Sequence, residues 1–223
     1  SNGSLSNHIR FYFNQPGPES ALSSPGAGQP HFKPAGLNSV SGTYTDASTV
    51  QVRIINVTES PDKVWTGGTN WVSTSTYLYG CSDTTYVVGQ STCGFIGVGT
   101  FGGGNWSRDV TGIWPSGSNQ LTVEARAARE APFVLEGTPF VSRSFIIDGD
   151  EPSSGLLEPN AVYERAVPMI TGTATDIGLG EIAKVEIAIS TGLQARYWDG
   201  SFWIASSSWL LTTAADGNGF NSN

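Results

Sequence analysis

The stretch that decides the fold is Tyr-Trp-Asp-Gly-Ser-Phe-Trp at residues 197–203, which has an earlier counterpart in Trp-Thr-Gly-Gly-Thr-Asn-Trp at residues 65–71. In each, two Trp residues flank a polar turn that contains glycine, the residue that tight hairpin turns need for positive φ. A strand-like run leads into each hairpin, Val-Gln-Val-Arg-Ile at residues 50–54 and Val-Glu-Ile-Ala-Ile at residues 185–189. The chain therefore contains one strand-hairpin pattern twice.

A third motif is also repeated, as Gly-Thr-Tyr-Thr-Asp at residues 42–46 and Gly-Thr-Ala-Thr-Asp at residues 172–176. The copies are offset by 130 residues at this motif, by 135 at the strand before the hairpin and by 132 at the Trp that closes the hairpin. Differences of a few residues are expected where two copies differ only in the lengths of their turns. The sequence therefore predicts a tandem repeat of about 130 residues.

The composition favours strands and turns over helices. The chain has 223 residues with 28 Gly, 12 Pro and few charges, and its periodic stretches alternate with period two, so we expect an all-β fold. A net charge of -8 and a pI near 4.6 argue against nucleic acid or an anionic membrane as partner. No apolar run approaches the roughly 20 residues of a membrane span.

The first complete unit is placed at residues 37–148. Its expected strands are residues 39–45, 49–58, 71–79, a strand after Trp106, 120–128 and 140–147. Residues 120–128 alternate so regularly that one face should be buried and the other wet. An acidic, Pro-containing linker at residues 149–168 follows, and the second unit occupies residues 169–223.

Residues 1–36 parallel the end of the first unit. His-Ile-Arg-Phe-Tyr-Phe-Asn at residues 8–14 matches Ser-Arg-Ser-Phe-Ile-Ile-Asp at residues 142–148, and a Pro-rich link follows each. We therefore interpret residues 1–36 as the final strand of a preceding repeat plus a Pro/Gly-rich link. The strand residues are Ile9, Arg10, Phe11, Tyr12 and Phe13.

The second unit is incomplete. In the alignment Asn223 falls opposite Asn105, so residues 120–128 and 140–147 have no counterparts. Two explanations stay open. Either the chain is a segment of a longer array of repeats, or residues 9–13 of one molecule complete the open unit of the next by strand donation, a head-to-tail contact that builds filaments. One donated strand does not replace everything that is missing.

The first copy carries an insertion, residues 80–104, that contains Cys81 and Cys93. Two cysteines around a loop insertion predict a local disulfide and an oxidising compartment, so we expect an extracellular or cell-surface location. Such a disulfide would stabilise the fold by about 3 kcal/mol in the chain-entropy model. Asn56 and Asn105 begin N-glycosylation sequons, which act only in a host with the enzyme machinery.

Together the Gly-Thr-x-Thr-Asp motif, the Val-rich strand, the aromatic hairpin and Ser-Ser-Ser-Trp-Leu at residues 206–210 resemble the immunoglobulin-like repeats of large bacterial secreted and surface proteins. The resemblance covers residues 37–223. It implies tandem immunoglobulin-like β-sandwiches of roughly seven strands each, the second incomplete within this chain, with no enzymatic activity of their own. The first copy departs from the pattern at Gly67-Gly68 and at the cysteine-bearing insertion.

The aromatic hairpins have two interpretations. Large rings with a polar turn between them are typical of a sugar-stacking platform, but both copies keep the Trp pair although their turns differ, which favours packing across the hairpin and onto the core. The residues concerned are Trp65, Trp71, Tyr197, Trp198 and Trp203.

Acidic residues gather at the link between the units. Asp148, Asp150 and Glu151 lie there, and the topology of the repeat returns Asp176 to the same junction. Such carboxylates could hold Ca²⁺ and stiffen the joint, whereas the alternative is a solvated acidic linker. We expect no other cofactor.

Catalytic signatures are missing from the sequence. Its two histidines, His8 and His31, precede the first unit, and it has no His-Glu-x-x-His, phosphate loop or Gly-x-Ser-x-Gly. We expect a non-catalytic spacer, stalk or assembly module of a bacterial or archaeal surface protein, with further copies, neighbouring repeats or a cell-surface glycan or protein as partners. The alternatives are a filament subunit joined by strand donation and a carbohydrate-binding module.

Overall fold

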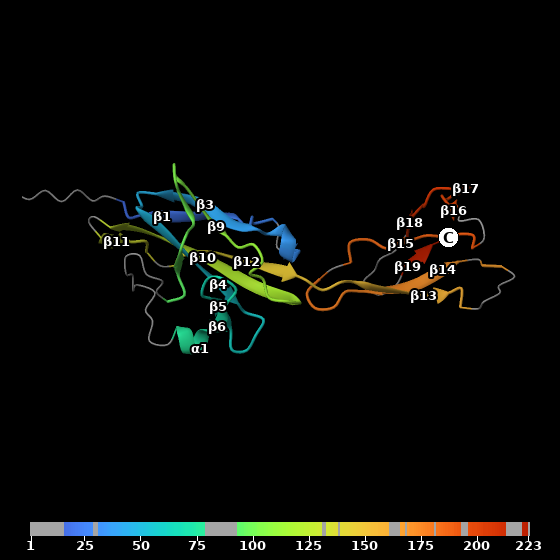
Figure 1. Cartoon of the computed structure of the whole chain (residues 1–223), viewed down its shortest axis with the longest axis horizontal. Helices are drawn as coiled ribbons and strands as arrows, with labels where there is room; N and C mark the ends of the chain where they lie inside the picture. The colour runs from blue at the N-terminus through green and yellow to red at the C-terminus, as the bar shows by residue number, and fades with distance from the viewer. Residues whose placement is uncertain are drawn as a thin grey trace, which may run out of the picture.

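The structure, a computed structural model, is all-β, and the helices among its described residues are one turn, α1 (Thr74–Tyr77), and a short 3-10 segment, η1 (Pro34–Gly36). The described residues are 16–28, 31–78, 93–130, 133–137, 139–160, 166–167, 169–180, 182–192, 196–212 and 220–222. Figure 1 shows two lobes along the long axis, a first lobe formed by β1–β12 and a second lobe formed by β13–β19.

Two sheets build the first lobe. The smaller sheet has the order β1 (Glu19–Ser24), β3 (Ser39–Thr45), β9 (Asn105–Asp109) and β8 (Thr100–Gly102). The larger sheet has the order β2 (His31–Phe32), β12 (Val141–Asp148), β10 (Ser118–Glu130), β4 (Thr49–Asn56), β5 (Lys63–Trp65) and β6 (Trp71–Ser73), with β11 (Phe133–Leu135) on β10 and β7 (Ile96–Gly97) on β4.

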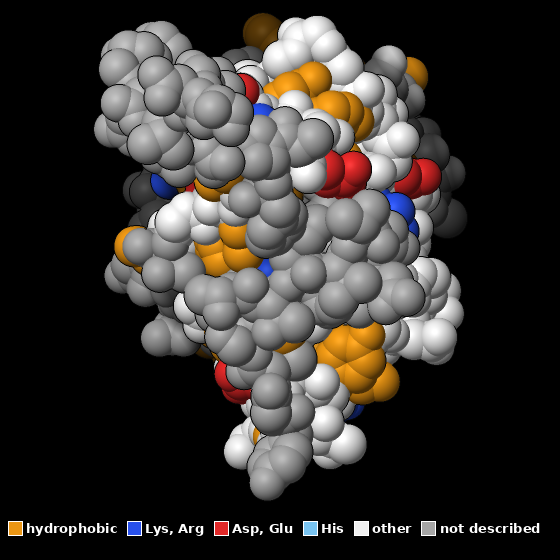
Figure 2. Space-filling model, turned by 90° about the vertical axis from the view of Figure 1, so that its left-hand side faces the viewer, with side chains coloured by type: hydrophobic (Ala, Val, Ile, Leu, Met, Phe, Trp, Pro, Cys, Tyr) orange, Lys and Arg blue, Asp and Glu red, His pale blue; other side chains and the backbone are white. Residues whose placement is uncertain are grey.

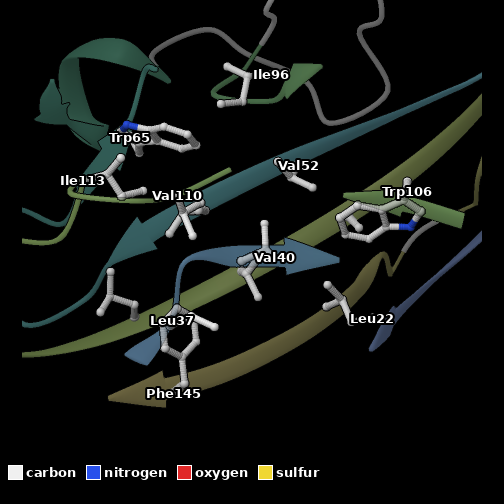
Figure 3. Close-up of a cluster of buried hydrophobic side chains, with 14 of the residues drawn as sticks. Leu22, Leu37, Val40, Val52, Trp65, Ile96, Trp106, Val110, Ile113 and Phe145 are labelled. Carbon is white, nitrogen blue, oxygen red and sulfur yellow. The ribbon is translucent and has the colours of Figure 1, made fainter. Parts of the chain in front are cut away.

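The core lies between these two sheets (Figure 3). Val40 of β3 and Trp106 of β9 enter it from the smaller sheet, and Val52 of β4, Val123 of β10 and Phe145 of β12 enter it from the larger one. Alternation along each strand explains this, because every second side chain points to the same face. On the face seen in Figure 2, the hydrophobic side chains of described residues are visible in separate groups.

The second lobe consists of three small sheets. One sheet has the order β13 (Ser153–Glu158), β14 (Ile170–Thr175) and β19 (Phe220–Ser222), and the two others pair β15 (Glu186–Ile187) with β18 (Leu210–Leu211) and β16 (Tyr197–Trp198) with β17 (Trp203–Ile204). Its buried core among the described residues is small, consisting of Ala174, Val185 and Ile187.

Both predicted links contain strands, which corrects that part of the sequence interpretation. β1 lies within residues 1–36 and pairs with β3, and β13 lies within residues 149–168 and pairs with β14. Each pairing has an irregularity two residues before the strand ends, between Leu22 and Ser24 and between Leu156 and Glu158. Both stretches are rich in Ser and are followed by Pro, so their own sequences carry little strand signal, and the edge of a neighbouring strand supplies the hydrogen bonds.

The remaining predictions are partly confirmed. The strand at residues 39–45 is confirmed, and β4, β9, β10 and β12 correspond to four further predicted strands with shifted ends. The strand at residues 71–79 is wrong after Ser73, where α1 begins. Both the backbone N–H and the hydroxyl of Thr74 donate to the carbonyl of Asp62, at 2.8 and 3.0 Å. These bonds continue the register of the β5–β6 ladder by one more pair, after which the turn of α1 takes over, with the Leu78 N–H donating to the carbonyl of Thr74 at 2.8 Å.

The placement of Asn223 opposite Asn105 is also corrected. Gly42 of β3 pairs with Trp106, whereas Gly172 of β14 pairs with Phe220. Gly42 and Gly172 begin the same motif, so Phe220 holds the register position of Trp106. The sequence match had placed Phe220 opposite Gly102, four residues earlier in the first copy. The sequence match failed because it continued the hairpin as a strand and so aligned Leu210 too early.

Candidate functional site: the junction cleft and the aromatic hairpins

The first aromatic hairpin is part of the core. Trp65 of β5 faces Trp71 of β6 across the hairpin and is only 1% exposed. Its indole N–H donates to the carbonyl of Gly68 at 2.8 Å, and that of Trp71 donates to Ile113 at 2.8 Å. The guanidinium of Arg108 lies 5.3 Å from the centre of the Trp65 ring. A sugar therefore has no free face of Trp65 on which to stack.

The second hairpin is more open. Trp198 and Trp203 again pair across the strands, with ring centres 5.6 Å apart and planes tilted by 58°. At the turn, the Asp199 carboxylate accepts hydrogen bonds from the N–H groups of Ser201 and Phe202 at 2.8 and 2.7 Å. These two hydrogen bonds lower the pKa of Asp199 below its usual 3.8, and the one from the Phe202 N–H has the larger effect. Trp203 is exposed and Tyr197 and Trp198 are half-buried, so glycan stacking here stays a prediction.

The junction brings three of the four predicted carboxylates together. The Ser118 hydroxyl lies 2.5 Å from Asp148 Oδ1 and 2.9 Å from Asp150 Oδ2, and 3.4 Å from the carbonyl of Ile177 in the second lobe. Asp176 lies at the same place, whereas Glu151 is exposed and does not line the cleft. The cleft has a volume of about 460 Å³, and Lys33 and Lys184 line it together with these carboxylates.

Two glycines allow this close approach. A Cβ on Gly180 would lie 2.3 Å from Asp148 Oδ2 and 2.5 Å from Asp176 Oδ2, and one on Gly178 would lie 2.7 Å from the Ser118 side chain. Gly178 also has a φ of +91°, which other residues rarely adopt. Sequence reasoning missed both glycines and Ser118, although the Gly-x-Gly pattern at residues 178–180, two residues after Asp176, was a usable signal of close packing.

Calcium binding at this junction stays a prediction. Oδ1 of Asp176 is buried and has no hydrogen-bond partner in the described part of the chain. Within that same part, however, no three or more His, Cys, Asp or Glu side chains are grouped as a metal site. Lys33 and Lys184 also line the cleft, and Lys184 forms an ion pair at 2.9 Å with Glu186, which lines it too. Calorimetric titration with calcium chloride tests the prediction directly.

A buried cation cluster was not expected from the sequence. Phe95 is fully buried, with the guanidinium carbons of Arg53 and Arg126 4.4 and 4.0 Å from its ring centre. Arg126 is 1% exposed and donates to the Gln51 side-chain oxygen at 3.0 and 2.7 Å. The predicted wet face of residues 120–128 is therefore confirmed only in its first part, where Gln120 is exposed and Thr122 and Glu124 are half-buried, and is wrong at Arg126, which Phe95 covers. Alternation identifies two faces but does not tell what lies over the second one.

Two predictions concern residues outside the described part of the chain. Cys81 and the strand-donor residues 9–13 belong there, so the disulfide and the strand donation stay predictions. Cys93 is described; it is buried and lies two residues before Phe95. Among the described residues no helix is long and apolar enough to cross a membrane.

Comparison with known proteins gives no match: no family model, curated protein or solved structure is similar to this chain.

Proposed function

We propose that this chain is a non-catalytic structural segment of a bacterial or archaeal extracellular protein, built from successive copies of one immunoglobulin-like β-sandwich and acting as a spacer or stalk. The main support is the register shared by the two lobes. β1–β3 and β13–β14 both form five residue pairs, and the irregularity falls at the same pair in each. Unrelated edge pairings have no reason to agree in length, register and position of a bulge.

Further pairings agree in the same way. Val52 of β4 pairs with Ile96 of β7, and Ile187 of β15 pairs with Leu210 of β18. Beyond each pair, one more backbone bond follows at the same offset, from Val98 to Val50 at 3.3 Å and from Thr212 to Val185 at 3.0 Å. These agreements support one domain pattern used twice, with the additional residues of the first copy inserted before β7.

A spacer must limit the angle between its units, and the junction has the contacts for this. Only four residues, 149–152, separate β12 from β13. Ser118 holds Asp148 and Asp150 at the end of the first lobe and reaches the backbone of Ile177 in the second. We propose that this hydrogen-bonded joint, rather than a catalytic centre, is the working part of the junction cleft.

Distance measurements between the lobes test the joint. Spin labels would be attached through unnatural amino acids at Thr43 and Thr173, two exposed positions that correspond by register. Electron–electron resonance should give one narrow distance distribution, and Ser118→Ala should broaden it. Ser144→Ala, which removes a hydroxyl bonded only to Thr122 among the described contacts, is the matched control and should change nothing. A distribution as broad as that of a flexible linker for the unsubstituted chain would refute the spacer proposal.

Electron microscopy separates the spacer from the filament alternative. Isolated particles or short rods fit a spacer. Filaments that disappear when residues 1–14 are deleted would instead support assembly by strand donation.

A further inference from the structure

The second lobe exposes large apolar side chains that the first lobe buries at the corresponding positions. Leu22 of β1 is 8% exposed, whereas Leu156, at the same register position of β13, is 65% exposed. Phe95 precedes β7 and is fully buried, whereas Trp209 precedes β18 and is 63% exposed. Large apolar side chains that are exposed where the first lobe buries their counterparts indicate surfaces that a partner covers.

The covering elements are known from the first lobe, because β1 contacts both β10 and β12 there. Arg126, which covers one side of Phe95, also belongs to β10. The exposed state of Leu156 and Trp209 is therefore what the first lobe would show if β10 and β12 were taken away.

The backbone of the second lobe has a matching open edge. In the first lobe β4 pairs with β7 along one edge and with β10 along the other, through eight pairs from Thr49↔Ala128 to Asn56↔Leu121. In the second lobe β15 pairs with β18 in the position of β7. No described strand pairs with the other edge of β15, so its N–H and C=O groups are available to a further strand.

We propose that the second lobe is an acceptor for a β-hairpin of the β10–β12 type, whose first strand pairs with the open edge of β15 and whose second strand covers Leu156. This inference rests on the proposed equivalence of the two lobes, and it adds the structure of the hairpin that the second lobe binds. The register also sets the side chains of that partner. Val52 faces Ala125 and Ile54 faces Val123 in the first lobe, so the incoming strand presents a small residue opposite Ile187 and a branched one opposite Ile189.

The test completes the second lobe with the first lobe's own strands. Ser222 holds the register position of Arg108, so a copy of residues 110–148 appended after Asn223 continues the pattern without a gap. Amide hydrogen exchange at residues 185–189 should slow by at least about tenfold relative to the unextended chain, because the open edge becomes paired. Binding of a dye that reports exposed apolar surface should fall at the same time.

Two controls sharpen the result. Val123→Asp in the appended copy places a charge in the core and should abolish the protection, whereas Thr122→Asp, on the opposite face, should leave it. Unchanged exchange at residues 185–189 in the extended chain would overturn the proposal. A second outcome would also overturn it: residues 185–189 are already protected in the unextended chain, and deleting residues 1–14 removes that protection. The occupant would then be the N-terminal segment of a second copy. The spin-label distances across the junction do not depend on the appended strands, so either failure leaves the spacer proposal to its own test.

Discussion

Replacing Trp65 by alanine should destabilise the first lobe by about 4 kcal/mol. The ring is 1% exposed, and a buried Trp side chain removes about 150–250 Å² from water, which at about 25 cal/mol per Å² is worth about 4–6 kcal/mol. Alanine retains a small part of this, and the lost indole bond to Gly68 adds about 1 kcal/mol. Because area burial taken from the folded structure is an upper bound, the lower end of this sum, which falls within the 3–5 kcal/mol typical of core Trp→Ala substitutions, sets the expected loss at about 4 kcal/mol.

Trp198→Ala is the matched comparison because Trp198 holds the same hairpin position in the second lobe but is half-buried. Its cost should be less than half as large. Chemical denaturation followed by far-ultraviolet circular dichroism gives the free energy of unfolding, and amide exchange at residues 50–56 assigns the change to the first lobe. A loss below about 1 kcal/mol for Trp65→Ala, with glycan binding abolished, would refute core packing and favour the carbohydrate module.

Gly42→Ala should lower the free energy of unfolding by about 3 kcal/mol or more, because its Cβ would lie 1.7 Å from the Ala21 carbonyl oxygen and displace β1. Gly36→Ala is the control, since nothing lies within 4 Å of its Cβ, and it should change this free energy by less than about 0.5 kcal/mol. Thermal denaturation measures both. Asp199 should titrate below 3.8 by NMR. Because the pKa of Asp199 is lowered in the folded state, its hydrogen bonds contribute to the free energy of unfolding above the unfolded-state pKa. This contribution is lost as pH falls through the folded-state pKa. Asp199→Asn should remove this acid dependence. In a host that glycosylates sequons, mass spectrometry should find a glycan at exposed Asn105 and none at Asn56, which is fully buried and bonded to Asn119; a glycan on Asn56 would contradict the described packing.

The strands with clear alternation could be predicted because their pattern is local. Ser39–Thr45 is confirmed to the residue, and the hairpins at Trp65 and Trp198 were marked by glycine and by paired aromatic residues. A period of two and a positive-φ turn depend only on neighbouring residues, so one sequence is enough to find them.

What the sequence by itself determined is thus the all-β class, the positions of the strongly patterned strands and the repetition of one motif order. Tertiary structure decided the rest. β1 and β13 are strands because β3 and β14 offer them an edge. Arg126 is buried because Phe95 covers it on the outer face of β10. Asp148 and Asp176 both approach Gly180 because it has no Cβ to displace their carboxylates. In each case the deciding partner is distant in sequence or on another element, and no local pattern encodes which side chain arrives there.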